Sequence, residues 1–172
     1  MKTRIIAFLI LVVLFALPGF AQEKSRKQLK EEEKQRKIAE VENLLNTKDF
    51  VFVARFAMPV GRRQVDLSGN PNFVKFNPEL FDGYMPFFGE ATAMAAYGGD
   101  GGIKFREKPT EYTVEKKKKN FLVEAQVKGE TDVYRLSLTV SFEGSASLSV
   151  ISNNRSTISY QGEVMSPENH GK

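Results

Sequence analysis

The segment YRLSLTVSF, residues 134–142, alternates apolar and polar side chains without an error. Its even positions, from Tyr134 to Phe142, are apolar, and Arg135, Ser137, Thr139 and Ser141 lie between them. Successive side chains of a β-strand point to opposite faces, so this pattern predicts a strand with one buried and one solvent-facing side.

Three neighbouring segments continue the pattern. Residues 121–127 alternate in the other parity and are joined to the first strand by the polar residues 129–132, which suit a hairpin. Residues 146–150 and 158–160 supply two more strands, separated by the polar run 152–156. Four strands with short connections predict an antiparallel meander whose apolar face needs a cover.

The first 21 residues predict a secretory signal peptide. Lys2 and Arg4 precede an uncharged run of 13 residues that ends at Pro18 and Gly19. A membrane-spanning helix needs about 20 apolar residues, so the run is too short to be one. We expect cleavage between Ala21 and Gln22, a periplasmic or extracellular product, and no stable membrane span after cleavage.

The remaining sequence has the length of one domain. The leader carries two basic residues and no acid, so its removal lowers the formal net charge from +4 to +2, which does not favour a nucleic-acid partner. The chain has no cysteine and one histidine, His170, so thiol chemistry and the common zinc sites are excluded. We predict no cofactor, no metal and no catalytic residue.

The predicted fold class is α+β: an N-terminal helix followed by a strongly curved antiparallel β-sheet or barrel-like meander of about eight strands. Residues 22–46 form a charged N-terminal helix or spacer, in which residues 22–37 are solvated or bind a partner. The apolar stripe of Ile38, Val41, Leu44 and Leu45 docks on the domain. Residues 47–165 form a single β-rich domain, and residues 166–172 a flexible tail. Further strands are expected at residues 50–58, 62–67, 73–76, 103–105 and 111–115.

The least regular interval, residues 77–105, holds the candidate binding residues. Aromatic side chains form sugar or lipid pockets, and they also fill cores. Asp100 lies among four glycines and is a possible cation ligand, but calcium takes six to eight oxygens, and the alternative is a bent loop. The predicted ligand-binding residues are Phe81, Tyr84, Phe87, Phe88, Tyr97 and Asp100.

Two charged groups have functional and structural interpretations. The run Lys116–Lys119 either contacts anionic glycans, lipid headgroups or a partner, or forms a solvated hairpin tip. Asp66, Glu79, Asp82 and Glu90 either supply a hydrolytic carboxylate pair or serve in turns and on the surface.

Four motifs resemble a known family: VKFNP at 74–78, GYMPFFG at 83–89, YGGDGGI at 97–103 and SNNRS at 152–156. The chain from about Leu44 onward is similar to a family of small secreted proteins of Bacteroidota labelled domain of unknown function 4251. The resemblance implies a periplasmic or envelope location in a Gram-negative cell. It implies no activity, substrate or site residue.

The sequence therefore predicts a non-enzymatic binding module of the cell envelope, with a small ligand or an envelope protein as partner near residues 73–105. A structural or helper protein of the envelope is the alternative. A carboxylate-based hydrolase is disfavoured because no acid, base and nucleophile constellation is present.

Overall fold

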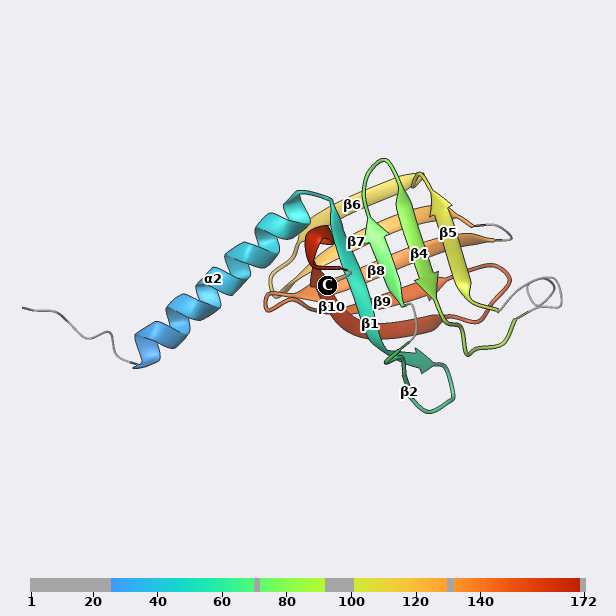
Figure 1. Ribbon diagram of the computed structural model, residues 1–172, viewed down its shortest axis with the longest axis horizontal. Coiled ribbons are helices and arrows are strands. Elements are labelled where there is room, and N and C mark those ends of the chain that lie inside the picture. Colours follow the sequence, from blue (N-terminus) through green and yellow to red (C-terminus); the bar gives the residue numbers. More distant parts are fainter. Residues whose placement is uncertain (1–25, 70–71, 92–100, 130–131, 171–172) are drawn as a thin grey trace, which may run out of the picture. The chain divides into compact units, whose positions relative to one another are not determined.

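The computed structural model describes residues 26–69, 72–91, 101–129 and 132–170. Helix α2, Arg26–Asn46, is followed by the strands and by a short 3₁₀ helix, η1, Pro167–Asn169 (Figure 1). The strands are β1 Phe50–Pro59, β2 Val65–Asp66, β3 Phe73–Phe76, β4 Phe81–Met85, β5 Ile103–Glu107, β6 Glu111–Lys116, β7 Asn120–Lys128, β8 Val133–Ser141, β9 Ser145–Ile151 and β10 Ile158–Met165.

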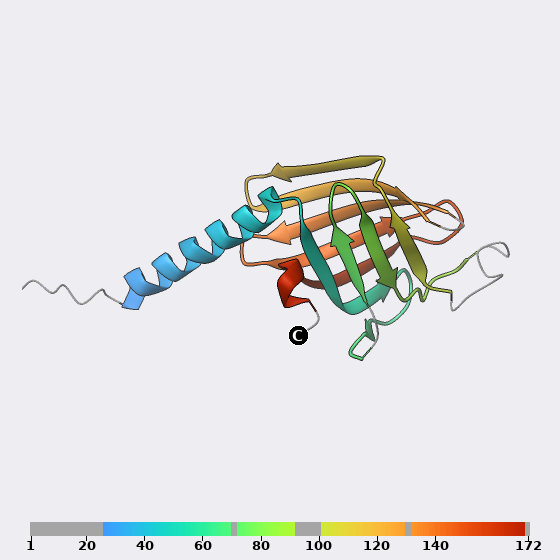
Figure 2. The same cartoon turned by 45° about the horizontal axis from the view of Figure 1, so that its top comes forward.

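The strands form one antiparallel sheet in the order β5-β4-β3-β1-β10-β9-β8-β7-β6, and β2 pairs with β1 off this path. The sheet curls into a half-barrel (Figure 2). The predicted α+β class and strongly curved antiparallel sheet are confirmed. The predicted meander is β7 to β10, and its last strand pairs with the first strand of the domain, β1.

The alternation in β8 sorts its side chains as the sequence predicted. Tyr134, Leu136, Leu138 and Val140 are buried, whereas Arg135 and Thr139 are exposed. β7, β9 and the first half of β10 follow the same rule, so one face of the sheet lines a continuous core and the other meets solvent.

Aromatic packing joins the two ends of the sheet across the core. The ring centroid of Phe81 in β4 lies 5.0 Å from that of Phe76 in β3 and 5.0 Å from that of Tyr112 in β6. Both pairs pack edge to face. β4 is one strand from one end of the sheet, and β6 is the other end. The Tyr112 hydroxyl donates to the Lys48 carbonyl at 3.1 Å. Burial first, and the Asp49 carboxylate second, raise the pKa of Tyr112, so this hydroxyl keeps its proton.

The last turns of α2 dock on this core, as predicted. Within the compact unit of residues 34–172, Leu45 is fully buried, and Val41 and Leu44 pack against the core. Glu42 pairs with Lys116 of β6 at 2.6 Å. The described residues 26–33 belong to the other compact unit and are all exposed, as the charged sequence predicted for a helix without an apolar stripe.

The tail was expected to be flexible, and this stays a prediction. Its described part has a defined arrangement, because η1 turns the chain and the His170 ring lies 4.8 Å from the ring of Phe73.

Phe81→Ala tests the aromatic junction. The substitution removes a fully buried ring and its contacts to Phe76 and Tyr112, so we expect the free energy of unfolding to fall by about 3–5 kcal/mol. Urea denaturation followed by circular dichroism measures the loss. Leu80→Ala, one residue away at a side chain that is 39% exposed, is the matched control and should cost less than about 1 kcal/mol. Equal effects of the two variants would contradict a special role for Phe81.

Candidate functional site

The predicted aromatic site is divided between two faces of one strand. Residues around Phe81 were expected to be irregular, but residues 81–85 form β4. Phe81 faces inward and is fully buried in the core, whereas Tyr84 faces outward and is half-buried. Their odd separation in sequence requires this, because strand side chains alternate. Tyr97 and Asp100 lie outside the described residues.

Phe87 belongs to a cluster that unites three of the sequence motifs. The Arg155 guanidinium lies 5.1 Å from the Phe87 ring centroid, and its Nη1 donates to the Gly101 carbonyl. The Ser156 N–H donates to the Glu90 carbonyl at 2.8 Å. Arg155 of SNNRS thus contacts both Phe87 of GYMPFFG and Gly101, a described residue of YGGDGGI.

The cluster covers the core rather than opening a cavity into it. Phe87 and Phe88 are half-buried and pack against core residues. The Tyr160 hydroxyl donates to the Pro86 carbonyl at 2.8 Å and ties this segment to β10. Burial raises the pKa of Tyr160, which keeps that donor protonated.

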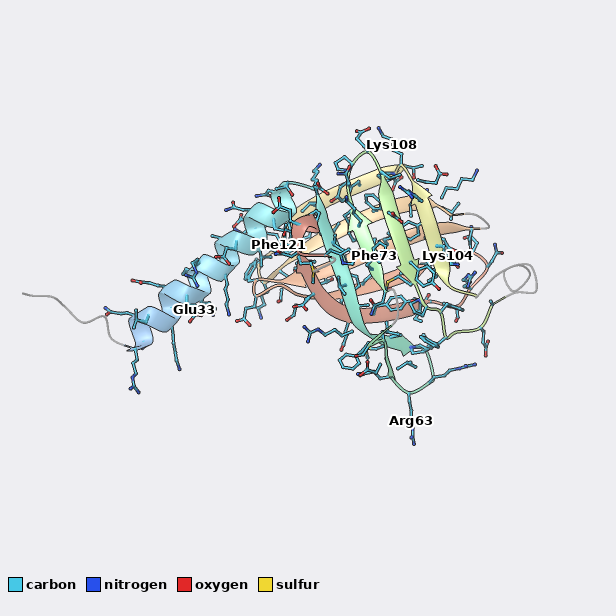
Figure 3. All side chains as sticks on the ribbon, viewed as in Figure 1. Glu33, Arg63, Phe73, Lys104, Lys108 and Phe121 are labelled. Atoms are coloured by element: carbon cyan, nitrogen blue, oxygen red, sulfur yellow. The ribbon has the colours of Figure 1, made fainter. Side chains whose placement is uncertain are left out.

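Tyr84 lines a hollow of about 580 Å³ that opens to solvent beside β4, β5 and the end of β7. We call it the Tyr84 hollow. Lys104 is on the outward side of β5 and is labelled in Figure 3; its ammonium lies 4.9 Å from the Tyr84 ring centroid. The charged and aromatic residues that line the hollow are Asp82, Tyr84, Lys104, Phe105, Arg106, Glu107 and Lys128.

The packing of Phe105 requires a glycine at position 83. Phe105 of β5 stands opposite Gly83 in the β4–β5 pair, and a Cβ at Gly83 would come within 2.4 Å of the Phe105 ring. Phe105 packs over this backbone from the core side, and so fills the space that a missing side chain leaves in the sheet. Both residues line the hollow.

The Tyr84 hollow contains more positive than negative charge. Arg106 Nε lies 3.9 Å from the Asp82 carboxylate, which is close enough for an ion pair but too long for a direct hydrogen bond. The lining has three basic residues, Lys104, Arg106 and Lys128, and two acidic residues, Asp82 and Glu107. The net charge of the lining is therefore +1. This arrangement suits a small anion or a ligand with charges of both signs.

The sequence analysis missed the basic residues of this hollow. Alternation in IKFRE, residues 103–107, puts Ile103 and Phe105 on one face and Lys104 and Arg106 on the other. This signal was readable, but the pairing of β5 with β4, which brings Lys104 opposite Tyr84, was not.

Three of the four candidate acids, Asp66, Glu79 and Asp82, have separate partners, and Glu90 contacts Ser156 through its backbone. Asp66 accepts from the Ser68 N–H at 2.7 Å, and bonds from Ser68 hold the pKa of Asp66 below its usual value. Glu79 pairs with Lys108 at 2.9 Å, and Asp82 belongs to the Tyr84 hollow. Within the described part of the chain, no three His, Asp or Glu side chains gather as a metal site requires.

The lysine run occupies the turn between β6 and β7. Lys116 pairs with Glu42, and Lys117 pairs with Glu115, so two of the four charges are engaged. Glu115 raises the pKa of Lys117 through a hydrogen bond and through its charge. Lys118 and Lys119 form no ion pair with any described residue.

A buried carboxylate holds together the turns near Arg155. Asp132 is 8% exposed and precedes β8. Its carboxylate accepts three backbone N–H bonds, from Val133 at 2.8 Å, Asn153 at 3.2 Å and Asn154 at 3.1 Å. Burial raises the pKa of Asp132, but hydrogen bonds to the carboxylate outweigh that effect and lower it.

Asp132→Asn should lower the free energy of unfolding by about 1.5–3 kcal/mol at pH 7, because a neutral amide replaces a charged acceptor and turns an NH₂ toward a backbone donor. The folded-state pKa lies below the ordinary 3.8, so the contribution of Asp132 is complete above that pH and is lost as the pH falls through the folded-state value. Urea midpoints measured from pH 7 to pH 2 should show the parent and variant converging in acid. Asp82→Asn, at an exposed pair, is the control and should cost less than about 1 kcal/mol. A pH-independent difference for Asp132→Asn would contradict this account.

Comparison with known proteins identifies the chain by family. The family model described as domain of unknown function (DUF4251) matches residues 32–164. The crystal structure of a DUF4251 family protein from Bacteroides eggerthii has a similar fold, with a TM-score of 0.58 and 18% sequence identity over 76% of this chain and 88% of that one. No curated protein matches. Helix α2 does not have the apolar length needed to cross a membrane, and it is the one long helix in the described residues. The chain belongs to the DUF4251 family.

Proposed function

We propose that this protein is a non-enzymatic binding module of the cell envelope, and that its ligand is a small molecule with at least one anionic group bound in the Tyr84 hollow. The observation that carries the proposal is the joining of an aromatic ring and a cation, Tyr84 and Lys104, at a hollow of about 580 Å³. This is the size of a small-molecule site.

The chemistry of the hollow favours recognition over reaction. Tyr84 offers a ring face and a hydroxyl, Lys104 and Arg106 offer charged donors, and Asp82 and Glu107 offer acceptors. A ligand carboxylate or phosphate would replace water around Lys104 and Arg106, and an adjacent polar group would meet Asp82. No histidine lines the hollow, and no described nucleophile with a neighbouring base stands in it.

The envelope location rests on the N-terminal sequence. Residues 1–25 lie outside the described part of the chain. Their charged start, their short apolar run and the small residue Ala21 at the expected cleavage site support export followed by cleavage. A fold without cysteine suits such a compartment because it needs no oxidation step to become stable.

Export can be tested directly. When the full chain is expressed in a Gram-negative host, we expect the periplasmic protein to begin at Gln22, as intact-mass spectrometry would show. Ala21→Leu should block cleavage, because the small residue at the cut is lost, and Ala39→Leu, in the exposed part of α2, is the control. A cytoplasmic protein that keeps Met1 would contradict the proposal.

Binding can be tested by native mass spectrometry of the mature chain, followed by thermal-shift titration with a panel of small carboxylates and phosphate esters. We expect one panel member to raise the melting temperature of the parent protein. Lys104→Gln should weaken that interaction about tenfold, since a charge-assisted bond is lost, and Tyr84→Ala should weaken it further.

Lys108→Gln is the matched control, because Lys108 pairs with Glu79 outside the hollow. It should leave the affinity unchanged. A ligand that binds the parent and both hollow variants equally would contradict this site.

A further inference from the structure

A second hollow, of about 520 Å³, lies on the solvent-facing side of the sheet over β8, β9 and β10. We call it the serine hollow. It shares no lining residue with the Tyr84 hollow. β1 and the turn before β7 supply its rims.

Small neutral side chains make the floor. Outward positions of adjacent strands are in register, so Thr139 of β8 stands opposite Ser147 of β9, and Ser147 opposite Gln161 of β10. Ser141 and Ser145 also line the floor. The chain has 27% charged residues, yet none stands on this floor. The solvent-facing side of a sheet usually has long charged side chains, so the short ones here explain why the surface is hollow.

A β-bulge supplies one rim. The β1–β10 register passes from Ala54 opposite Gly162 to Phe56 opposite Gln161, which leaves Arg55 as an extra residue. Ala54 and Ala57 are buried, so two consecutive side chains, Arg55 and Phe56, both reach the outer face. Bulges redirect side chains in this way and are common beside functional sites.

Gly162 makes the bulge possible. A Cβ at this position would come within 1.9 Å of the Val53 carbonyl oxygen and 2.8 Å of the Ala54 Cα. The two backbones can approach this closely only at a glycine. The bulge in β1 brings the half-buried Phe56 to the outer face, and Gly162 of β10 allows the close approach of the two strands that the bulge requires. Both residues line the serine hollow.

The charge on the rims is positive. Lys119, in the turn before β7, lines the hollow and forms no ion pair with any residue the structure describes. Arg55 lines the rim formed by β1, and its guanidinium lies 2.6 Å from the Glu163 carboxylate. Both side chains of this ion pair are exposed to solvent. Lys119 is thus the cation on the rim that is available to a ligand.

We propose that the serine hollow binds an acidic oligosaccharide. Sugar hydroxyls both donate and accept hydrogen bonds, as do the hydroxyls of Thr139 and Ser147 and the amide of Gln161. The Phe56 ring supplies an apolar face for a pyranose, and Lys119 supplies the counter-charge for a carboxylate. Nucleic acid is disfavoured because its binding requires many unpaired cations.

The probe is a set of oligogalacturonates of two to six units, and malto-oligosaccharides of equal length are the neutral comparator. Isothermal titration of the mature chain should show binding of the acidic series, with affinity that falls as salt concentration rises. Lys119→Gln should weaken it about fivefold. Ser147→Asp places a negative charge on the floor, where it would repel the anionic ligand, so binding should fall below detection. Circular dichroism and the melting temperature of this variant report whether it folds.

Lys118→Gln is the matched control, since it removes the same charge from the neighbouring residue outside the hollow. It should bind as the parent does. The proposal is overturned if the acidic series does not bind, if the neutral series binds equally well, or if Lys118→Gln and Lys119→Gln have the same effect. Lys104→Gln should not alter this binding, so failure here is distinguishable from failure of the Tyr84 hollow.

Discussion

The structure depends on the packing of Phe81 against Tyr112 and Phe76. Hydrogen bonds connect each strand to its neighbours but do not join β5 to β6, the two ends of the sheet. A half-barrel of this kind would leave its apolar interior open on one side. Edge-to-face contacts between β4 and β6 close that side with side chains. The interior is thereby filled with rings, and the two hollows described above open to solvent.

The outer face can change its chemistry without disturbing the core. Alternation sends every second side chain of β8, β9 and β10 outward, so the floor of the serine hollow consists of residues that contribute little to core packing. The same holds for Tyr84 and Lys104, whose strand neighbours Met85 and Ile103 are buried. Most residues that line the two hollows therefore differ from those that form the core; Phe105 and Ala146 belong to both groups.

Much of this fold was predictable from periodicity, and the exceptions have physical causes. β7, β8, β9 and the first half of β10 alternate cleanly, and the docked end of α2 has its apolar stripe. β4 was missed because Gly83, a poor strand former, interrupts a five-residue segment next to Pro86. Phe105 of β5 packs against Gly83 and fills the space left by its missing side chain. A contact between two strands of this kind cannot be predicted from a single sequence. Of the predicted site residues, Phe81 proved to be core, and Tyr84 and Phe87 reached two different places. The bulge at Arg55 was not predictable because the extra residue is defined only by its register with β10.

The pairing of β1 with β10 also has a consequence for how the protein reaches its folded state. These strands lie side by side in the middle of the sheet, and the Arg55–Glu163 bond joins residues 108 positions apart. Closing so long a loop costs conformational entropy, and non-local pairings of this kind are typical of slowly folding β proteins. A chain that still lacks β10 can pair β1 with β2 and β3, but the other edge of β1 stays open, and the buried side chains Ile158 and Tyr160 are missing from the core. The last strand in the sequence therefore joins the half of the sheet formed by β1 to β5 to the half formed by β6 to β9, so the sheet cannot be completed before β10 has been synthesised.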